Sequence, residues 1–356
     1  RSAMPAAPGE VEVSAEMGWA GLEAAASRVT TRGWLGKVWL KAVEVVTGVS
    51  SADVAQASAA VIAAKVDGKV DAGVYELAPD ALGALAGSGR KRAQMAAGGA
   101  RQLVLVHGTF VDTASTFAKL WQMHPQAVRA LFEHYGAGRV FALDHPTLGA
   151  SPIANALTLA RACRQGARLH LVTHSRGGLV AEVLARVCAR GVNADELKLF
   201  ADRQDEDGLA LSYAAHRADL AALAKLVKDN DIRVERIVRV ACPAHGTLLA
   251  SKRLDAYLSV LQWGLDLAQI PVLPELVDFL SEVARRRMRP NELPGLEAMT
   301  PDSPVLKWLN GPGAPIDGQL RVVAGDVKAD SPIAWLKTLL SDAFYWTDND
   351  LVVQTR

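Results

Sequence analysis

The stretch 171–178, with the sequence LVTHSRGG, decides the fold of this chain. It begins as an apolar run, passes through His-Ser-Arg-Gly-Gly, and continues into residues 179–187, where Leu and Val recur every four positions as on one face of a helix. A strand that turns this sharply into a helix places Ser175 on a strained turn, and a small neighbour such as Gly177 lets the strand and the helix approach each other. Thr173 stands two residues before Ser175, where such turns usually have a glycine. We therefore expect its β-branched side chain to make the packing of this turn tighter. The pattern predicts that Ser175 is a nucleophile and not a chance match within a turn.

The sequence from residue 101 onwards predicts the fold class. Short apolar runs alternate with helical patterns, which is typical of an α/β fold, a mostly parallel sheet flanked by helices. The predicted strands lie at 102–106, 139–143, 169–173, 236–241 and 320–324. The predicted helices lie at 116–134, 153–163, 178–189 and 332–344. In such sheets functional residues gather at the carboxyl ends of the strands.

The same patterns divide the chain into four parts. Residues 1–100 are predicted to form an extension of helices and strands that braces the sheet, with a strand at 73–77 and a mobile connector at 79–100. Residues 101–250 hold the first part of the core, including a polar helical insertion at 191–231. Residues 251–315 contain an apolar helical stretch, which we interpret either as a lid or as a packed cap without a moving part. Residues 316–356 hold the last part of the core.

Composition narrows the classes of function. The 39 basic residues nearly cancel the 38 acidic ones, so no overall field would draw this protein onto nucleic acid or an anionic membrane. Three cysteines, an odd number, argue against a disulfide framework and favour a reducing compartment. No apolar stretch of about 18 residues and no signal-peptide pattern appears, so we expect no transmembrane segment and a cytoplasmic location. Without zinc-type His/Cys spacing or a Gly-x-Gly-x-x-Gly loop, no metal and no organic cofactor is implied.

A second apolar strand ends in a motif that suits the same chemistry. A serine hydroxyl attacks a carbonyl effectively when a base takes its proton, an acid orients that base, and N–H donors stabilise the developing oxyanion. The backbone N–H of Arg176, directly after the nucleophile, is the first donor. In residues 103–110, LVLVHGTF, a strand ends in His-Gly, and Gly108 lets the loop bring the N–H of Thr109 towards Ser175 as the second donor. His107 is then structural.

Together these residues resemble the α/β-hydrolase family, in particular its bacterial lipase and esterase branch, over residues 101–353. Three further segments are similar to lipase sequences: 144–151 (DHPTLGAS), 243–247 (PAHGT, a turn that precedes a lid) and 301–304 (PDSP). The resemblance implies acylation of Ser175 by a carboxylic ester. The residues that we expect to line the site are His107, Gly108, Phe110, His145, His174 and His245.

The resemblance places the catalytic acid after the strand that follows the lid, and two residues fit. Asp326 directly follows the predicted strand 320–324, whereas Asp350 lies in DNDLVV, which resembles the Asn-Asp-Gly-x-Val segment that carries the acid in bacterial lipases. We prefer Asp350, although Leu351 replaces the glycine of that pattern. A purely structural Asp326 would be a turn residue that bonds its own backbone.

The sequence contains no histidine at the position where this family carries its catalytic base. All eight histidines lie at or before His245, whereas the family places its histidine after the acid. We therefore expect the native protein to continue beyond Arg356, or a second fragment or chain to supply the missing part. His145 or His245 could otherwise stand in as the base, His174 is expected to point elsewhere, and His216 is expected to be a solvated helical residue.

Three functions follow as candidates. The first is a serine hydrolase that acts on carboxylic esters, with a small-molecule or lipid-like acyl substrate favoured by the apolar stretch at 254–283. The second is a catalytically inactive hydrolase-like domain that binds a ligand or a partner protein. The third is an amide or peptide hydrolase on the same fold, because a Ser-His-Asp triad serves esters and amides alike.

Overall fold

The computed structural model of this protein describes residues 67–68, 70–85, 88, 91–109, 111–204, 208, 210–246, 290, 293–311 and 318–323. Its centre is a sheet with the strand order β1-β3-β2-β4-β7-β8. These strands are β1 (Gly73–Glu76), β2 (Arg101–Val106), β3 (Val140–Asp144), β4 (Arg168–His174), β7 (Arg233–Val240) and β8 (Gln319–Val323). Only β1 runs antiparallel to its neighbour, β3, and the other pairings in this sheet are parallel. The predicted α/β class with a mostly parallel sheet is therefore confirmed.

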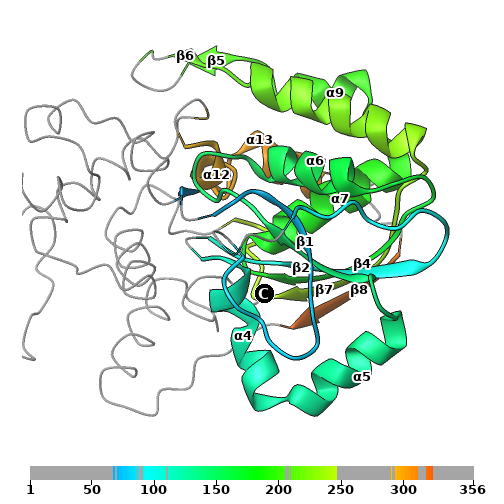
Figure 1. Ribbon diagram of the computed structural model, residues 1–356. Coiled ribbons are helices and arrows are strands. Elements are labelled where there is room, and N and C mark those ends of the chain that lie inside the picture. Colours follow the sequence, from blue (N-terminus) through cyan, green and yellow to red (C-terminus); the bar gives the residue numbers. More distant parts are fainter. Residues whose placement is uncertain are drawn as a thin grey trace, which may run out of the picture.

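Helices cover both faces of the sheet (Figure 1). On one face lie α4 (Thr113–Met123) and α5 (Pro125–Tyr135), and on the other lie α6 (Pro152–Ala162), α7 (Gly177–Arg190) and α9 (Ala214–Asp229). The remaining described elements are α8 (Ala194–Lys198), the short pair β5 (Arg203–Gln204) and β6 (Ala210–Leu211), α12 (Pro294–Glu297) and α13 (Pro304–Leu309). Within the described residues, no helix is long and apolar enough to cross a membrane.

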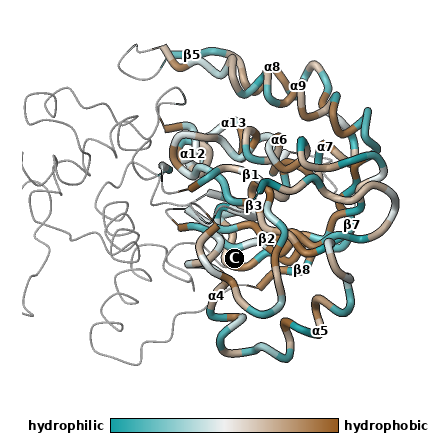
Figure 2. Tube along the Cα trace, in the orientation of Figure 1, coloured by the Kyte–Doolittle hydropathy of each residue, from teal (hydrophilic) through white to brown (hydrophobic). Residues whose placement is uncertain are grey.

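The alternation of side chains along β2 builds two separate cores. Leu103 and Leu105 pack with Trp121 of α4 and Val128 of α5, whereas the intervening valines join the larger cluster that α6, α7 and α9 cover. Successive residues of a strand point to opposite faces, so a strand that is apolar throughout is what a sheet covered on both sides requires. In Figure 2 hydrophobic residues gather in the sheet, while the outer helices α5 and α9 alternate between hydrophobic and hydrophilic residues.

The order of the strands fixes where a ligand can meet the sheet. From β2 the chain crosses through α4 and α5 to β3 on one side, and it then returns through α6 to β4 on the other side of β2. Right-handed crossovers in opposite directions put their helices on opposite faces, as observed. The crevice outside the carboxyl ends of β2 and β4 is therefore a topological switch point, the usual position of ligand sites in open α/β sheets.

Two predictions about the helix after β2 were wrong. The predicted helix 116–134 is two helices that meet at His124, because Pro125 lacks an N–H and disfavours helical geometry in the residue before it. The start of α4 lies earlier than predicted, where the Asp112 carboxylate and Ser115 form a reciprocal capping box. The predicted connector at 79–100 has no regular structure in its described part, where the side chains of Leu82, Leu85 and Met95 are buried.

The third wrong prediction concerns His216, which is buried and not solvated. Its ring packs against the rings of Phe200 and Tyr213, and burial lowers its pKa to about 4. The predicted helix at 332–344 and the apolar stretch 254–283 lie outside the described residues, as do residues 1–66 of the predicted N-terminal extension.

Candidate active site

Ser175 lies on the turn between β4 and α7, in a backbone conformation that L-residues rarely adopt. Its φ is +51°, and it is one of three non-glycine residues with positive φ in the described part of the chain. Its N–H donates to the carbonyl of Val240, which continues the β4–β7 pairing by one residue, and its carbonyl accepts from the N–H of Gly178 in the first turn of α7. A conformation of this kind costs about 1–3 kcal/mol, so the packing on both sides must hold it in place.

Two glycines allow three backbone segments to meet at this turn. A Cβ on Gly177 would lie 2.5 Å from the carbonyl oxygen of Val106 and 2.6 Å from that of His107, so α7 begins directly against the end of β2. A Cβ on Gly108 would lie 2.9 Å from the Cβ of Ser175. The loop after β2 is therefore in close contact with Ser175. Thr173 is buried, and its hydroxyl donates to the carbonyl of Val238 at 3.3 Å.

The two backbone N–H donors predicted for an oxyanion belong to the residues that follow Gly108 and Ser175, the two residues in contact. Thr109 follows Gly108 and is half-buried, and Arg176 follows Ser175 at the start of α7. Within the described part of the chain, neither the Thr109 N–H nor the Arg176 N–H donates to a protein group. Among the described residues, both N–H groups are therefore free to bind an acceptor. The positive end of the α7 dipole adds to the attraction for negative charge at this position.

A buried pair of histidines supports the loop after β2. The His107 ring is fully buried and stacks on the His145 ring with a centroid distance of 4.0 Å. His107 Nε2 accepts from the backbone N–H of His145 at 3.1 Å, so its Nδ1 carries the proton and donates to the carbonyl of Gly108 at 2.9 Å. Burial lowers the pKa of His107 to about 4 and holds that of His145 well below its usual range. Both rings are therefore neutral, and the 3.7 Å separation of His107 from the Asp144 carboxylate is not an ion pair.

The structure describes all eight histidines. His145 Nδ1 donates to the carbonyl of Leu143, and His170 pairs with the hydroxyl of Tyr135. His174 is half-buried with its Nδ1 near Gly108, and His245 is exposed in the turn after β7. His124 and His134 belong to the helices α4 and α5 or their junction. Of the predicted site residues, Phe110, Asp326 and Asp350 lie outside the described part of the chain.

The sequence did not reveal the role of the Arg176 side chain. Its guanidinium is fully buried and donates from Nη2 to the carbonyl of Ala150 at 2.5 Å and from Nε to the carbonyl of Gly295 at 3.3 Å. Burial lowers its pKa to about 10, which leaves it charged at neutral pH. The nearby carboxylate of Asp67 accepts from three successive backbone N–H groups, those of residues 147–149. The turn is thus tied to α12 and to the loop that leads into α6.

We expect Arg176→Met to destabilise the protein by roughly 2–4 kcal/mol, because the carbonyls of Ala150 and Gly295 would lose a buried, charged donor. Chemical denaturation followed by circular dichroism measures the change. Arg129→Met, on the exposed surface of α5, is the matched control and should shift the free energy of unfolding by less than about 0.5 kcal/mol. Equal stabilities for the two variants would show that the buried guanidinium does not hold the loops together.

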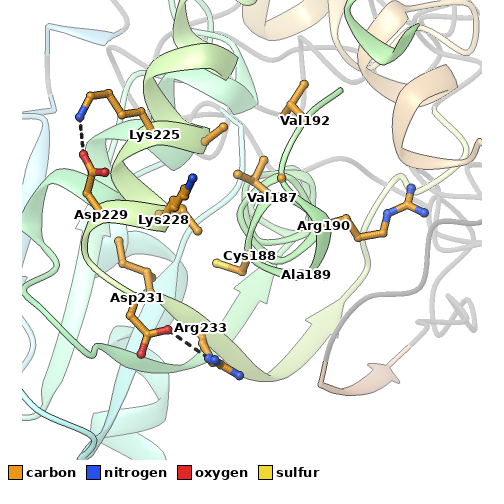
Figure 3. Close-up of a pocket in the computed structure, with 14 residues that line it drawn as sticks. Val187, Cys188, Ala189, Arg190, Val192, Lys225, Lys228, Asp229, Asp231 and Arg233 are labelled. Atoms are coloured by element: carbon orange, nitrogen blue, oxygen red, sulfur yellow. Dashed lines mark hydrogen bonds and ion pairs between the residues drawn. The ribbon is translucent and has the colours of Figure 1, made fainter. Parts of the chain in front are cut away.

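A surface depression with a volume of about 870 Å³ lies at the opposite end of α7 (Figure 3). It is lined by the C-terminal ends of α7 and α9 and by the start of β7, and α7, with 14 residues, is about 21 Å long. Two ion pairs lie among its lining residues, Lys225 with Asp229 and Arg233 with Asp231. None of the predicted site residues lies there, and within the described residues no group of His, Cys, Asp and Glu could hold a metal ion.

The chain belongs to a protein family described as "Domain of unknown function (DUF7379)", whose model matches residues 78–200 and 216–356. The description assigns the family no activity. No curated protein matches the chain.

Several solved structures are distantly similar. The mature lipase BlEst2 of Bacillus licheniformis is 15% identical over 74% of this chain and 81% of its own, with a TM-score of 0.36. Phospholipase PlaB of Legionella pneumophila is 13% identical over 71% of this chain and 44% of its own, with a TM-score of 0.39. The metagenomic carboxyl esterase MGS0156 is 17% identical over 77% of this chain and 66% of its own, with a TM-score of 0.34. At these TM-scores the similarity is too distant to assign a fold or an activity.

Proposed function

We propose that this protein is a serine hydrolase of the α/β-hydrolase type that cleaves carboxylic esters through Ser175. The observation that carries the proposal is the backbone of Ser175, held at a φ of +51° between β4 and α7 at the switch point of the sheet. A non-glycine residue in such a conformation supports a functional role, because the strain has to be maintained by the surrounding packing. The half-buried side chain would be reached from the crevice at the carboxyl ends of β2 and β4.

The backbone N–H groups of Thr109 and Arg176 would stabilise the oxyanion of the tetrahedral intermediate. Support comes from the close contact of Gly108 with Ser175 and from the absence of an acceptor for either N–H within the described residues. Donors that are fixed before the reaction stabilise developing charge without reorganising, which is why such a pair is worth about 10²–10³ in rate for each donor.

The general base would be a histidine carried beyond Arg356 or by a second fragment, with Asp350 as the residue that orients it. The histidines of this chain support that assignment, because His107, His145, His170 and His216 are buried in contacts with other groups. Asp326 is the second candidate for the acid. It follows β8 by three residues, and β8 ends beside β7, where the Ala241 N–H donates to the carbonyl of Val323.

Substitutions in the full-length protein distinguish between the two candidates for the catalytic acid. Asp350→Asn is expected to lower kcat on the order of 10⁴-fold, because the base loses the partner that fixes its tautomer and orientation. Asp326→Asn should then change kcat less than about tenfold. Asp348→Asn, two residues away from Asp350, controls for the loss of a charge in the same segment. The opposite ranking of the first two variants would transfer the role to Asp326.

The substrate class follows from the apolar sequence at 254–283, which favours an acyl or lipid-like group. We expect the full-length protein to hydrolyse p-nitrophenyl esters and to prefer acyl chains longer than acetyl, with matched anilides cleaved far more slowly. Faster cleavage of the anilides would favour an amide hydrolase. Absence of hydrolysis of either series would favour a domain that binds a ligand or partner without catalysis, since the described histidines are engaged elsewhere or exposed.

A further inference from the structure

The two proposed oxyanion donors belong to peptide groups whose carbonyl ends are both held. A trans peptide group is planar, and its C=O and N–H point in opposite directions, so fixing the oxygen fixes the direction of the hydrogen. The Thr109 N–H shares its peptide with the carbonyl of Gly108, and the Arg176 N–H shares its peptide with the carbonyl of Ser175. The described residues contain no cis peptide.

The two carbonyls are held by different means. That of Ser175 accepts from the N–H of Gly178 at 2.9 Å, a bond that the first turn of α7 supplies. That of Gly108 lies in a loop, and it accepts from Nδ1 of the His107 side chain at 2.9 Å. The orientation of the loop donor therefore depends on a side chain, whereas that of the helix donor depends on secondary structure.

We propose that His107 is a positioning residue that directs the Thr109 N–H at the oxyanion by holding the peptide between Gly108 and Thr109. The inference rests on the proposed function, since it assigns a role within that same site. His107 does not touch the reacting atoms and transfers no proton. It acts as a fixed donor at Nδ1.

The surroundings of the ring impose the tautomer that this role needs. The backbone N–H of His145 points at Nε2 and requires a lone pair there, so the single proton of the neutral ring must be on Nδ1. The stacked ring of His145 and complete burial keep the His107 ring in one orientation. The backbone N–H of His145, directly after β3, thus sets the tautomer of His107, directly after β2.

Substitution of His107 by asparagine or by glutamine tests its two hydrogen bonds one at a time. The amide nitrogen of Asn can occupy the position of Nδ1 and donate to the Gly108 carbonyl, but the side chain is too short to replace Nε2. The amide of Gln can reach the position of Nε2 and accept from the His145 N–H, but it leaves the Gly108 carbonyl without its donor. Each variant keeps one of the two bonds, so we expect both to lose similar stability.

We expect the activities of the full-length variants to differ. His107→Gln should lower kcat for a p-nitrophenyl ester by about 10²–10³-fold with KM changed less than threefold, because the lost interaction is made only in the transition state. His107→Asn should keep kcat within about tenfold of the wild type. His134→Gln, on the exposed surface of α5, is the control for the same substitution elsewhere.

Equal losses of kcat in the Asn and Gln variants of a hydrolysing protein would overturn this inference alone, while a wild type without hydrolysis would overturn it together with the proposed function. If a variant fails to fold, the wild type still provides a test through ¹⁵N signals of its histidine rings. We expect His107 as the neutral tautomer protonated at Nδ1 and unchanged between pH 5.5 and 9. A ring protonated at Nε2, or one that titrates in that range, would overturn the inference.

Discussion

Gly177→Ala is expected to prevent this protein from folding to a stable native state. The new Cβ would lie 2.5 Å from the carbonyl oxygen of Val106 and 2.6 Å from that of His107, distances at which something must move. Neither side can move cheaply. Val106 ends a central strand that is paired on both sides, with β3 and β4, and the first half of α7 is buried throughout. We expect a loss of more than about 4 kcal/mol, which exceeds an ordinary core substitution.

Soluble yield, circular dichroism and the midpoint of chemical denaturation measure this effect. Gly83→Ala is the matched control, because a Cβ at that position meets nothing within 4 Å and its φ is not positive. The control should unfold within about 0.5 kcal/mol of the wild type. A folded Gly177→Ala protein with wild-type stability would mean that α7 does not begin against the end of β2.

Ser175→Ala is expected to abolish hydrolysis in a protein that remains folded. Removal of the nucleophile costs on the order of 10⁴-fold or more in kcat, and any residual rate comes from the oxyanion donors and substrate binding. Alanine and serine tolerate positive φ about equally, so the turn between β4 and α7 should persist with little change in stability.

Initial rates on a p-nitrophenyl ester and a thermal melt of the same preparation test both halves of that expectation. Thr158→Ala removes a hydroxyl from α6, where it bonds the carbonyl of Ala154, and it should leave kcat within a factor of two. Hydrolysis by the Ser175→Ala protein at the wild-type rate would assign the activity to another group.

The elements that the sequence predicted best are those with strong local patterns. The strands β2 and β4 are rich in apolar residues, as buried parallel strands require, and their predicted limits agree with the structure to within one residue at each end. The helix after Ser175 has a four-residue apolar repeat and a glycine start, and it was likewise predicted to within one residue. The division of the predicted helix 116–134 before Pro125 could also have been predicted, because proline interrupts a helix regardless of the apolar pattern around it.

The supporting contacts of the candidate site could not be predicted in the same way. The Arg176 guanidinium bonds the carbonyls of Ala150 and Gly295, which are 26 and 119 positions away. A sequence shows no signal for a side chain that binds backbone carbonyls, because any residue type can supply the acceptor. Burial of His216 likewise depends on Phe200, a ring brought to it by the tertiary fold.

The most direct test of the account is covalent labelling of the full-length protein with a fluorophosphonate, followed by mass spectrometry of the modified peptide. The reagent reacts with a serine that has an activating base and oxyanion donors. The account predicts a single adduct on Ser175, absent from the Ser175→Ala protein. An unlabelled wild type, or an adduct on a different serine, would contradict it.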